Sequence, residues 1–195
     1  RVYLIPRIAA VVEVLEEEGI SASRALAETG LEEADLRSPD TRVSYRQVET
    51  VFRNATRLTK DPTVPFRAGQ RMHVCAYGMF GYALLSSPTR VEGIKLAIKY
   101  SRRLGMVVDV AFSRDDDTAT YILTALLSRN SPKDVYRFAL EFAFATCLTF
   151  STDVYGPSFK FSCLRATYPA PPHVDLYQSF FGCPVLFEQA GNELE

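Results

Sequence analysis

The stretch GYALLSSPTRVEGIKLAIKYSRRLG, residues 81–105, decides the fold at the middle of the chain. Its first half is small and apolar. Ser87 followed by Pro88 is typical of a helix start, with serine as N-cap and proline in the first turn. Thr89 and Glu92 offer another start, a capping box. Apolar side chains then fall on one face and basic ones mostly elsewhere, which predicts an amphipathic helix packed on a core. The apolar set is Val91, Ile94 and Ile98, and the basic set is Arg90, Lys95, Lys99, Arg102 and Arg103.

The chain before this stretch reads as a series of helices. A stripe that begins at Ile8 stops at Gly19, a natural residue just past a helix end. Ser21 or Ser23 can cap a short helix that ends near Gly30, and residues 31–39 form a short helix or turn. A longer helix is predicted from Ser44 to just before residues 61–62. These helices resemble a helix-turn-helix in outline, but the acidic character of the region argues against DNA recognition.

The second half of the chain changes period. Alternation over residues 106–112 and 118–127, separated by a polar turn at 113–117, predicts an antiparallel hairpin. A helix from Ser131-Pro132 to about Thr152 is apolar almost all round, which is typical of a central helix. A strand at 159–163, a short helix from Pro171 or Pro172, and a strand at 185–187 complete the pattern. We therefore expect an α+β fold, a helical N-terminal part packed on a small antiparallel sheet with a central buried helix. Residues 1–60 could form a helical subdomain.

Composition favours a single regulatory or binding domain. The formal net charge of 195 residues is −1, so the chain carries no electrostatic footprint for nucleic acid. Its one basic cluster, on the helix of the opening stretch, is read as a solvated face. Four widely spaced cysteines predict free thiols in a reducing cytoplasm and no metal site. The most apolar stretch, residues 138–150, is too short to span a bilayer.

Residues for catalysis are lacking. The chain has no GxSxG, Walker, Rossmann or HExxH motif, and no serine or cysteine has an assignable base. His173 is read as a capping or packing histidine, whereas His73, set among apolar residues, is a core or pocket side chain. We therefore predict that the protein is not an enzyme and needs no cofactor.

The sequence offers better candidates for a ligand-binding pocket than for a catalytic site. Tyrosines 77 and 82 flank glycines that permit close backbone approach, and a tyrosine offers an apolar wall with a polar tip. Glu141, the one charge between residues 138 and 150, must be paired or hydrogen-bonded if buried. It pairs with Arg137 or another internal arginine, or it anchors a cationic or hydroxyl-bearing ligand. We expect Glu141 and the segment 77–82 to lie near one internal cavity. The candidate ligand-binding residues are His73, Tyr77, Tyr82, Tyr100, Tyr121, Tyr136 and Glu141, each of which could instead be an ordinary packing residue.

Three blocks resemble one known family. The opening stretch is similar to its pattern G-x-x-G-y-a-l-l-s-s-p-T-l-x-e-A. VSYRQVETVFRNATRLTKDP from Val43 is similar to v-p-x-x-x-x-x-l-l-x-x-A-x-x-l-t-x-D-P. PPHVDLYQSFFGCPVLFEQAGNELE from Pro171 is similar to h-x-x-x-Y-x-x-x-F-g-c-p-V-x-F-x-x-x-x-N-x-L. The chain thus resembles the effector-binding, arabinose-binding-like N-terminal domain of AraC/XylS-type transcriptional regulators. It departs from the family at residues 63–66, where an apolar Gly-Leu pair is usual, so the local backbone there is expected to differ.

The resemblance implies a ligand-sensing domain over residues 1–195 that couples metabolite binding to DNA binding by a helix-turn-helix domain after residue 195. It implies a homodimer, and we place the contact surface on the C-terminal helices around residues 177–181. Direct nucleic-acid or membrane contact by residues 1–195 is not expected. The alternatives are a constitutive dimerisation module without ligand and a stand-alone small-molecule-binding protein.

Overall fold

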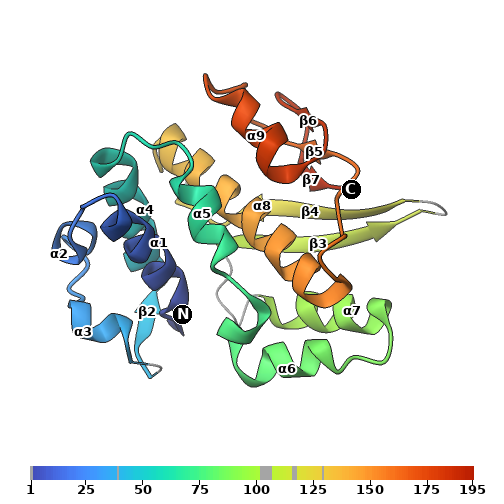
Figure 1. The fold of residues 1–195 in the computed structure, drawn as a ribbon, viewed down its shortest axis with the longest axis horizontal. Coiled ribbons are helices and arrows are strands. Elements are labelled where there is room, and N and C mark those ends of the chain that lie inside the picture. The colour runs from blue at the N-terminus through green and yellow to red at the C-terminus, as the bar shows by residue number, and fades with distance from the viewer. Residues whose placement is uncertain (1, 39, 102–106, 116–117, 129) are drawn as a thin grey trace.

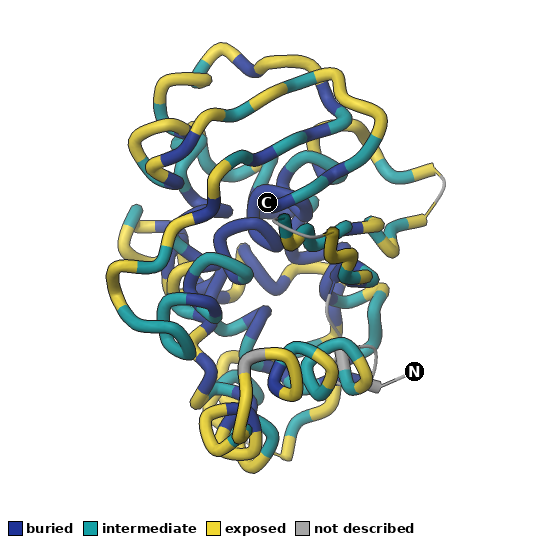
Figure 2. The backbone as a smooth tube through the Cα atoms, turned by 90° about the vertical axis from the view of Figure 1, so that its right-hand side faces the viewer, coloured by how far each residue is buried: buried dark blue, intermediate teal, exposed yellow. Residues whose placement is uncertain are grey.

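Helix α8 (Lys133–Tyr155) runs through the centre of the molecule, and the other elements are arranged around it (Figure 1). The structure, a computed structural model, describes residues 2–38, 40–101, 107–115, 118–128 and 130–195. Figure 2 shows the buried segments gathered in the interior and the exposed ones along the outer loops. The expected α+β fold with a central buried helix is confirmed.

Nine further helical elements surround α8 or cover its neighbours. They are α1 (Pro6–Glu17), α2 (Ala22–Ala25), α3 (Glu33–Leu36), α4 (Tyr45–Leu58), α5 (Val64–Gln70), the 3₁₀ helix η1 (Val74–Tyr77), α6 (Met79–Leu85), α7 (Arg90–Ser101) and α9 (Val174–Phe181), counted over the described residues. The predicted N-terminal helices are present, but α2 ends at Ala25, before the expected end near Gly30, and Ser21 precedes it without a capping hydrogen bond from its side chain. Gly19 has φ +77° just past α1, and Ser44 forms a capping box with Gln47 at the start of α4. The buried Phe52 ring then packs α4 on α8, 4.9 Å from the Phe138 ring centre.

Helix α5 lies against α8 at very short range. Gly69 permits this approach, because a Cβ at this position would stand 2.5 Å from the Ala145 Cβ and 2.7 Å from the Phe142 carbonyl oxygen. Residues 63–66 are the segment at which the sequence departs from the family pattern. The segment begins helix α5, and Pro65 is compatible with this because it falls in the first turn, where a missing N–H costs nothing.

A five-stranded sheet packs on the other side of α8. The strands are β3 (Val108–Arg114), β4 (Ala119–Ala125), β5 (Leu164–Arg165), β6 (Val185–Leu186) and β7 (Asn192–Leu194), in the order β3-β4-β7-β5-β6. The predicted hairpin is confirmed, with Val110 opposite Leu123, although Met106 and residues 116–117 of that prediction lie outside the described residues. A separate two-stranded sheet pairs β1 (Val2–Leu4) with β2 (Arg42–Ser44), which the sequence pattern did not indicate.

The predicted strand at 159–163 is wrong. Residues 159–161 belong to no strand, and the strand is β5, one residue past the expected end. The alternation has another cause, because the Phe159 and Phe161 rings pack on Tyr155 and Tyr121 at 5.2 and 6.1 Å. The small sheet is also not wholly antiparallel, since β5 and β6 run parallel.

The opening stretch folds as two helices. Of the two predicted starts for α7, the second is confirmed in part: the Thr89 hydroxyl accepts a hydrogen bond from the Glu92 amide at 3.3 Å. Ser87 instead donates to the Ala83 carbonyl at the end of α6. Gly81 lies so close to η1 that a Cβ there would stand 2.0 Å from the Val74 carbonyl oxygen. Arg102 and Arg103 of the predicted basic face lie outside the described residues.

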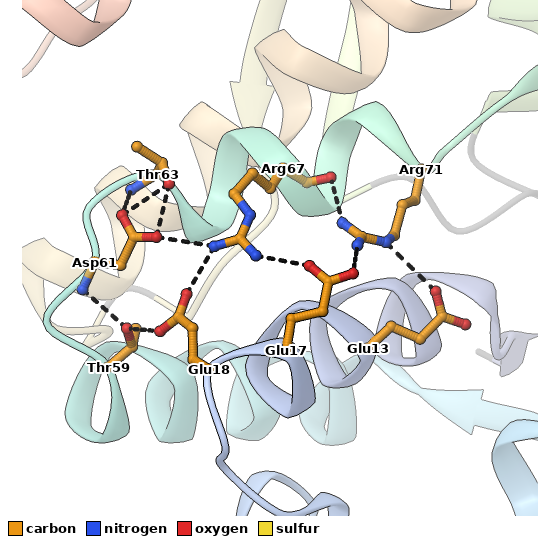
Figure 3. Close-up of polar contacts among 8 residues, drawn as sticks. All are labelled: Glu13, Glu17, Glu18, Thr59, Asp61, Thr63, Arg67 and Arg71. Carbon is orange, nitrogen blue, oxygen red and sulfur yellow. Dashed lines mark hydrogen bonds and ion pairs between the residues drawn. The ribbon is translucent and has the colours of Figure 1, made fainter.

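A chain of ion pairs ties α1 to α5 and to the loop before it (Figure 3). Arg67 contacts Glu17 at 2.7 Å and both Glu18 and Asp61 at 2.9 Å. Arg71 pairs with Glu17 and lies 3.6 Å from Glu13. The hydrogen bonds from Arg67 and Arg71 lower the pKa of Glu17. Burial raises the pKa of Asp61, but the hydrogen bonds from Thr63 and Arg67 outweigh it, so this pKa is lowered as well.

This network predicts loss of stability in acid. A carboxylate whose pKa is lower in the folded state stabilises the fold above its unfolded pKa, and this contribution is lost as pH falls through the folded value. We therefore expect the melting temperature to fall below about pH 4.5, near the unfolded pKa of Asp and Glu. An Arg67→Met variant should be less stable at pH 7 and should lose less on acidification, because the lowered pKa values depend on Arg67. Melting curves from pH 7 to 3 test this, with the exposed Arg57→Met as matched control. Parallel curves for Arg67→Met and the parent chain would contradict it.

Candidate functional site

An apolar cavity lies between one end of α8, the helices η1, α6 and α7, and the hairpin. Its volume is about 70 Å³, and its walls include Tyr77, Phe80, Ile94, Ala97, Tyr121 and Phe150. None of the described residues that line it carries a charge. Burial raises the pKa of the Cys147 thiol in this wall to about 12, so the thiol stays neutral at physiological pH. The cavity is therefore suited to an uncharged, apolar group.

A buried arginine stands behind the Tyr77 wall. The Arg7 guanidinium lies 5.8 Å from the centre of the Tyr77 ring, and the residue is 3% exposed. Burial lowers the pKa of Arg7, and its Nη2 atom has no hydrogen-bond partner. In the sequence the only sign was an arginine at the start of the apolar stripe of α1, and we attached no role to it.

A polar groove opens near the other end of α8. It has a volume of about 570 Å³ and lies between the end of α4, the loop before α5, the first turns of α8 and the residues before α9. Glu141 lines it with a side chain only 4% exposed. Tyr177 donates its hydroxyl to Glu141 Oε1, and Arg137 Nε lies 3.5 Å from the same oxygen. The predicted pairing of Glu141 with Arg137 is therefore present, although Tyr177 is the closer partner.

The structure brings two of the candidate residues together and disperses the rest. Tyr77 and Tyr121 line the apolar cavity, and Tyr100 lies behind its wall with its ring 5.9 Å from Phe80. Tyr136 is near the hydroxyl of Thr167 at 3.2 Å, and Tyr82 is 62% exposed. His73 is an exposed side chain, not a core one, and its Nδ1 lies 3.0 Å from Asp153.

One placement made from sequence is wrong, and another is narrowed. Glu141 and the segment 77–82 do not share a cavity, because Glu141 lines the polar groove and Tyr77 the apolar cavity. On α8 the nearest lining residues of the two sites are Glu141 and Thr146, which are five residues, or about 1.4 helical turns, apart. The surface proposed for dimer contact is also partly interior. Tyr177 and Phe181 are 0% and 3% exposed and pack on Phe66 at 4.9 and 5.6 Å.

Residues 19–195 match the family described as the arabinose-binding domain of AraC transcription regulators, N-terminal. The chain belongs to this family. The AraC-type match includes α4, the α6–α7 pair and the C-terminal strands, so it spans both sites described above.

Relatives of this AraC-type domain are named as transcriptional regulators and not as enzymes. The ornithine utilization regulator of Pseudomonas aeruginosa is 28% identical over 180 residues, which are 92% of this chain and 52% of that protein. An uncharacterised HTH-type regulator of Mycobacterium tuberculosis is 32% identical over 130 residues, 66% of this chain and 37% of its own length. The chain thus spans about half the length of these relatives or less.

A solved structure shares the fold. The transcriptional regulator CdpR from Pseudomonas aeruginosa superposes with a TM-score of 0.70 at 16% identity, over 95% of this chain and 52% of that one. Among the described residues, no helix is long and apolar enough to cross a membrane.

Proposed function

We propose that this chain is the ligand-sensing domain of an AraC-type regulator and that a small apolar group of its effector binds in the cavity beside Tyr77 and Tyr121. The observation that carries the proposal is the cavity itself, which has apolar and aromatic walls and no charged side chain among its described lining residues. Most small-molecule sites are concave and lined by apolar and aromatic side chains, as this one is.

The proposed mechanism is linkage between two sites. The cavity walls come from α8, from the α6–α7 pair and from the hairpin, so an occupant stabilises the arrangement in which these three units are closed on one another. That bias then passes to a DNA-binding domain of the whole protein. A coupling of about 1–3 kcal/mol is enough for a useful switch.

Filling the cavity tests this proposal. Ala97 lines the cavity on α7, and Ala97→Leu adds three carbon atoms to a space of about 70 Å³. Indole, phenol and 1-hexanol are suitable probes in a thermal-shift measurement. We expect at least one to raise the melting temperature of the parent chain, because ligand at about 100 times its Kd stabilises by about 2.7 kcal/mol. Ala97→Leu should abolish that rise while keeping the fold.

The matched control is Ala34→Leu, an exposed alanine on α3, which should leave the response to the probes unchanged. A response that survives Ala97→Leu would place the ligand elsewhere. No response from any probe, together with a higher melting temperature for Ala97→Leu itself, would show that the cavity is only a packing void.

Membership in the family implies three further properties, which stay predictions for this chain. They are a homodimer, an effector drawn from metabolism and DNA contact by another domain. Of the C-terminal helix α9, only the exposed residues, such as Val174 and Gln178, are available to a second copy.

A further inference from the structure

We propose that the polar groove at Glu141 is a second ligand site and that it binds the ammonium group of a small cationic amine or amino acid. This site is separate from the apolar cavity, and the proposal stands whether or not that cavity is occupied.

The first support is the incomplete pairing of Glu141. Its three neighbours, Tyr177, Arg137 and His173, all face the same oxygen, Oε1. Among the described residues none donates to Oε2, although the carboxylate lines the groove. Oε2 is not one of the buried atoms that lack a hydrogen-bond partner, so it is accessible from the groove, where a donor of a ligand can reach it. An ammonium group supplies three donors and a compensating charge.

The second support is His173, just before α9. Its Nε2 atom is buried without a hydrogen-bond partner and lies 3.6 Å from Glu141 Oε1, too far for a hydrogen bond. The ring is held in place by stacking on Tyr177, with centres 5.8 Å apart and planes 16° apart. The unsatisfied nitrogen and the carboxylate both line the groove, so one bound polar group can serve both.

The walls carry charges of both signs, which suits a ligand that has both an ammonium group and a carboxylate. The groove is lined by three carboxylates, Asp61, Asp134 and Glu141, and by two permanent cations, Lys60 and Arg137. Glu141 is the deepest of the three, whereas Asp61 is engaged by Thr63 and Arg67. Lys60 gives a carboxylate of the ligand a place to bind, since Arg137 is paired with Glu141, so an amino acid is complementary to both parts of the groove. The volume of about 570 Å³ is ample for a molecule of this size.

The experiment uses calorimetry and thermal shift with residues 1–195 and four probes. L-ornithine and putrescine carry the ammonium on a flexible chain, L-norvaline lacks the side-chain amine, and glutarate lacks any amine. We expect L-ornithine and putrescine to bind with a Kd of about 1 mM or tighter and glutarate not to bind. L-norvaline, which keeps one ammonium but no net charge, should bind more weakly than L-ornithine.

Two variants locate the binding. Glu141→Gln keeps the shape of the side chain and should weaken L-ornithine at least about ten-fold, the usual loss for a hydrogen bond to a charged group. Thr56→Trp fills the groove from α4 without removing a charge, and it should block binding of L-ornithine. This variant keeps the proposal testable if Glu141→Gln does not fold. Exposed Glu33→Gln is the matched carboxylate control, and Ala97→Leu controls for the apolar cavity; both should bind as the parent does.

Binding of L-ornithine that is unchanged in Thr56→Trp would overturn the proposal, and so would equal binding of glutarate. The proposal would also be overturned if neither L-ornithine nor putrescine bound to the parent chain. None of these outcomes bears on the apolar cavity, because that site is tested by different probes and by Ala97→Leu.

Discussion

Replacing Gly69 with alanine is expected to lower the free energy of unfolding by about 3 kcal/mol, or the melting temperature by roughly 6–12 °C. The added Cβ would meet Ala145 at 2.5 Å and two backbone atoms of α8, the Phe142 oxygen at 2.7 Å and the Thr146 nitrogen at 3.0 Å. Backbone atoms of a buried helix cannot turn aside as a flexible side chain can, so α5 must move away from α8. Chemical denaturation monitored by circular dichroism measures the loss.

The matched control for this substitution is Gly93→Ala on α7. A Cβ there meets only the Ser87 side chain, at 3.5 Å, which is an ordinary contact. Alanine also forms helix better than glycine, by up to about 1 kcal/mol, so this variant should be as stable as the parent chain or slightly more stable. If Gly69→Ala proved as stable as Gly93→Ala, the conclusion that α5 and α8 are in close contact at Gly69 would be contradicted.

Phe66→Ala is the second substitution with a large expected effect. The Phe66 ring is fully buried on α5, and its centre lies 4.9 Å from the Tyr177 ring and 5.6 Å from the Phe181 ring. Its removal leaves a cavity between α5 and α9 and should cost about 3–5 kcal/mol. Hydrogen exchange should also show that α9 loses protection more than α4 does, because Phe52, not Phe66, packs α4 on α8.

The half-buried Phe112 on the hairpin provides the comparison. It contacts Tyr121 at 5.3 Å, and Phe112→Ala should cost less than half as much as Phe66→Ala because less area leaves water. Equal losses for the two variants would mean that α9 is not anchored through Phe66.

Long elements with a regular pattern were easier to predict from the sequence than short ones, although the two-residue strand β6 lies within the strand predicted at 185–187. The apolar run of α8, the alternation of the hairpin and the helix start at Ser44 are each supported by a clear local pattern, and all three are confirmed. Strands β5 and β7 have two and three residues, too few to show a period. Their pairing depends on partners far along the chain, which local patterns do not contain.

The candidate sites divide in the same way. Aromatic residues next to glycines pointed to Tyr77 and, with the hairpin, to Tyr121, and the lone charge on α8 pointed to Glu141. No pattern showed that Arg7 would be buried without a hydrogen-bond partner for Nη2, or that His173 would fold over Glu141. Both outcomes result from how α1 and α9 dock, which is a tertiary effect.

The position of β7 has a consequence for the order in which the sheet assembles during synthesis. β7 lies between β4 and β5, and the Asn192 side chain donates to the Leu123 carbonyl across 69 residues of chain. A ribosome releases the hairpin first, so its inner edge stays open until β7 emerges and joins the two halves of the sheet. An open strand edge can pair with another chain, which makes nascent protein vulnerable to aggregation over that interval. Slow translation of the segment between α8 and β7 would therefore lower the soluble yield without changing the stability of the finished fold.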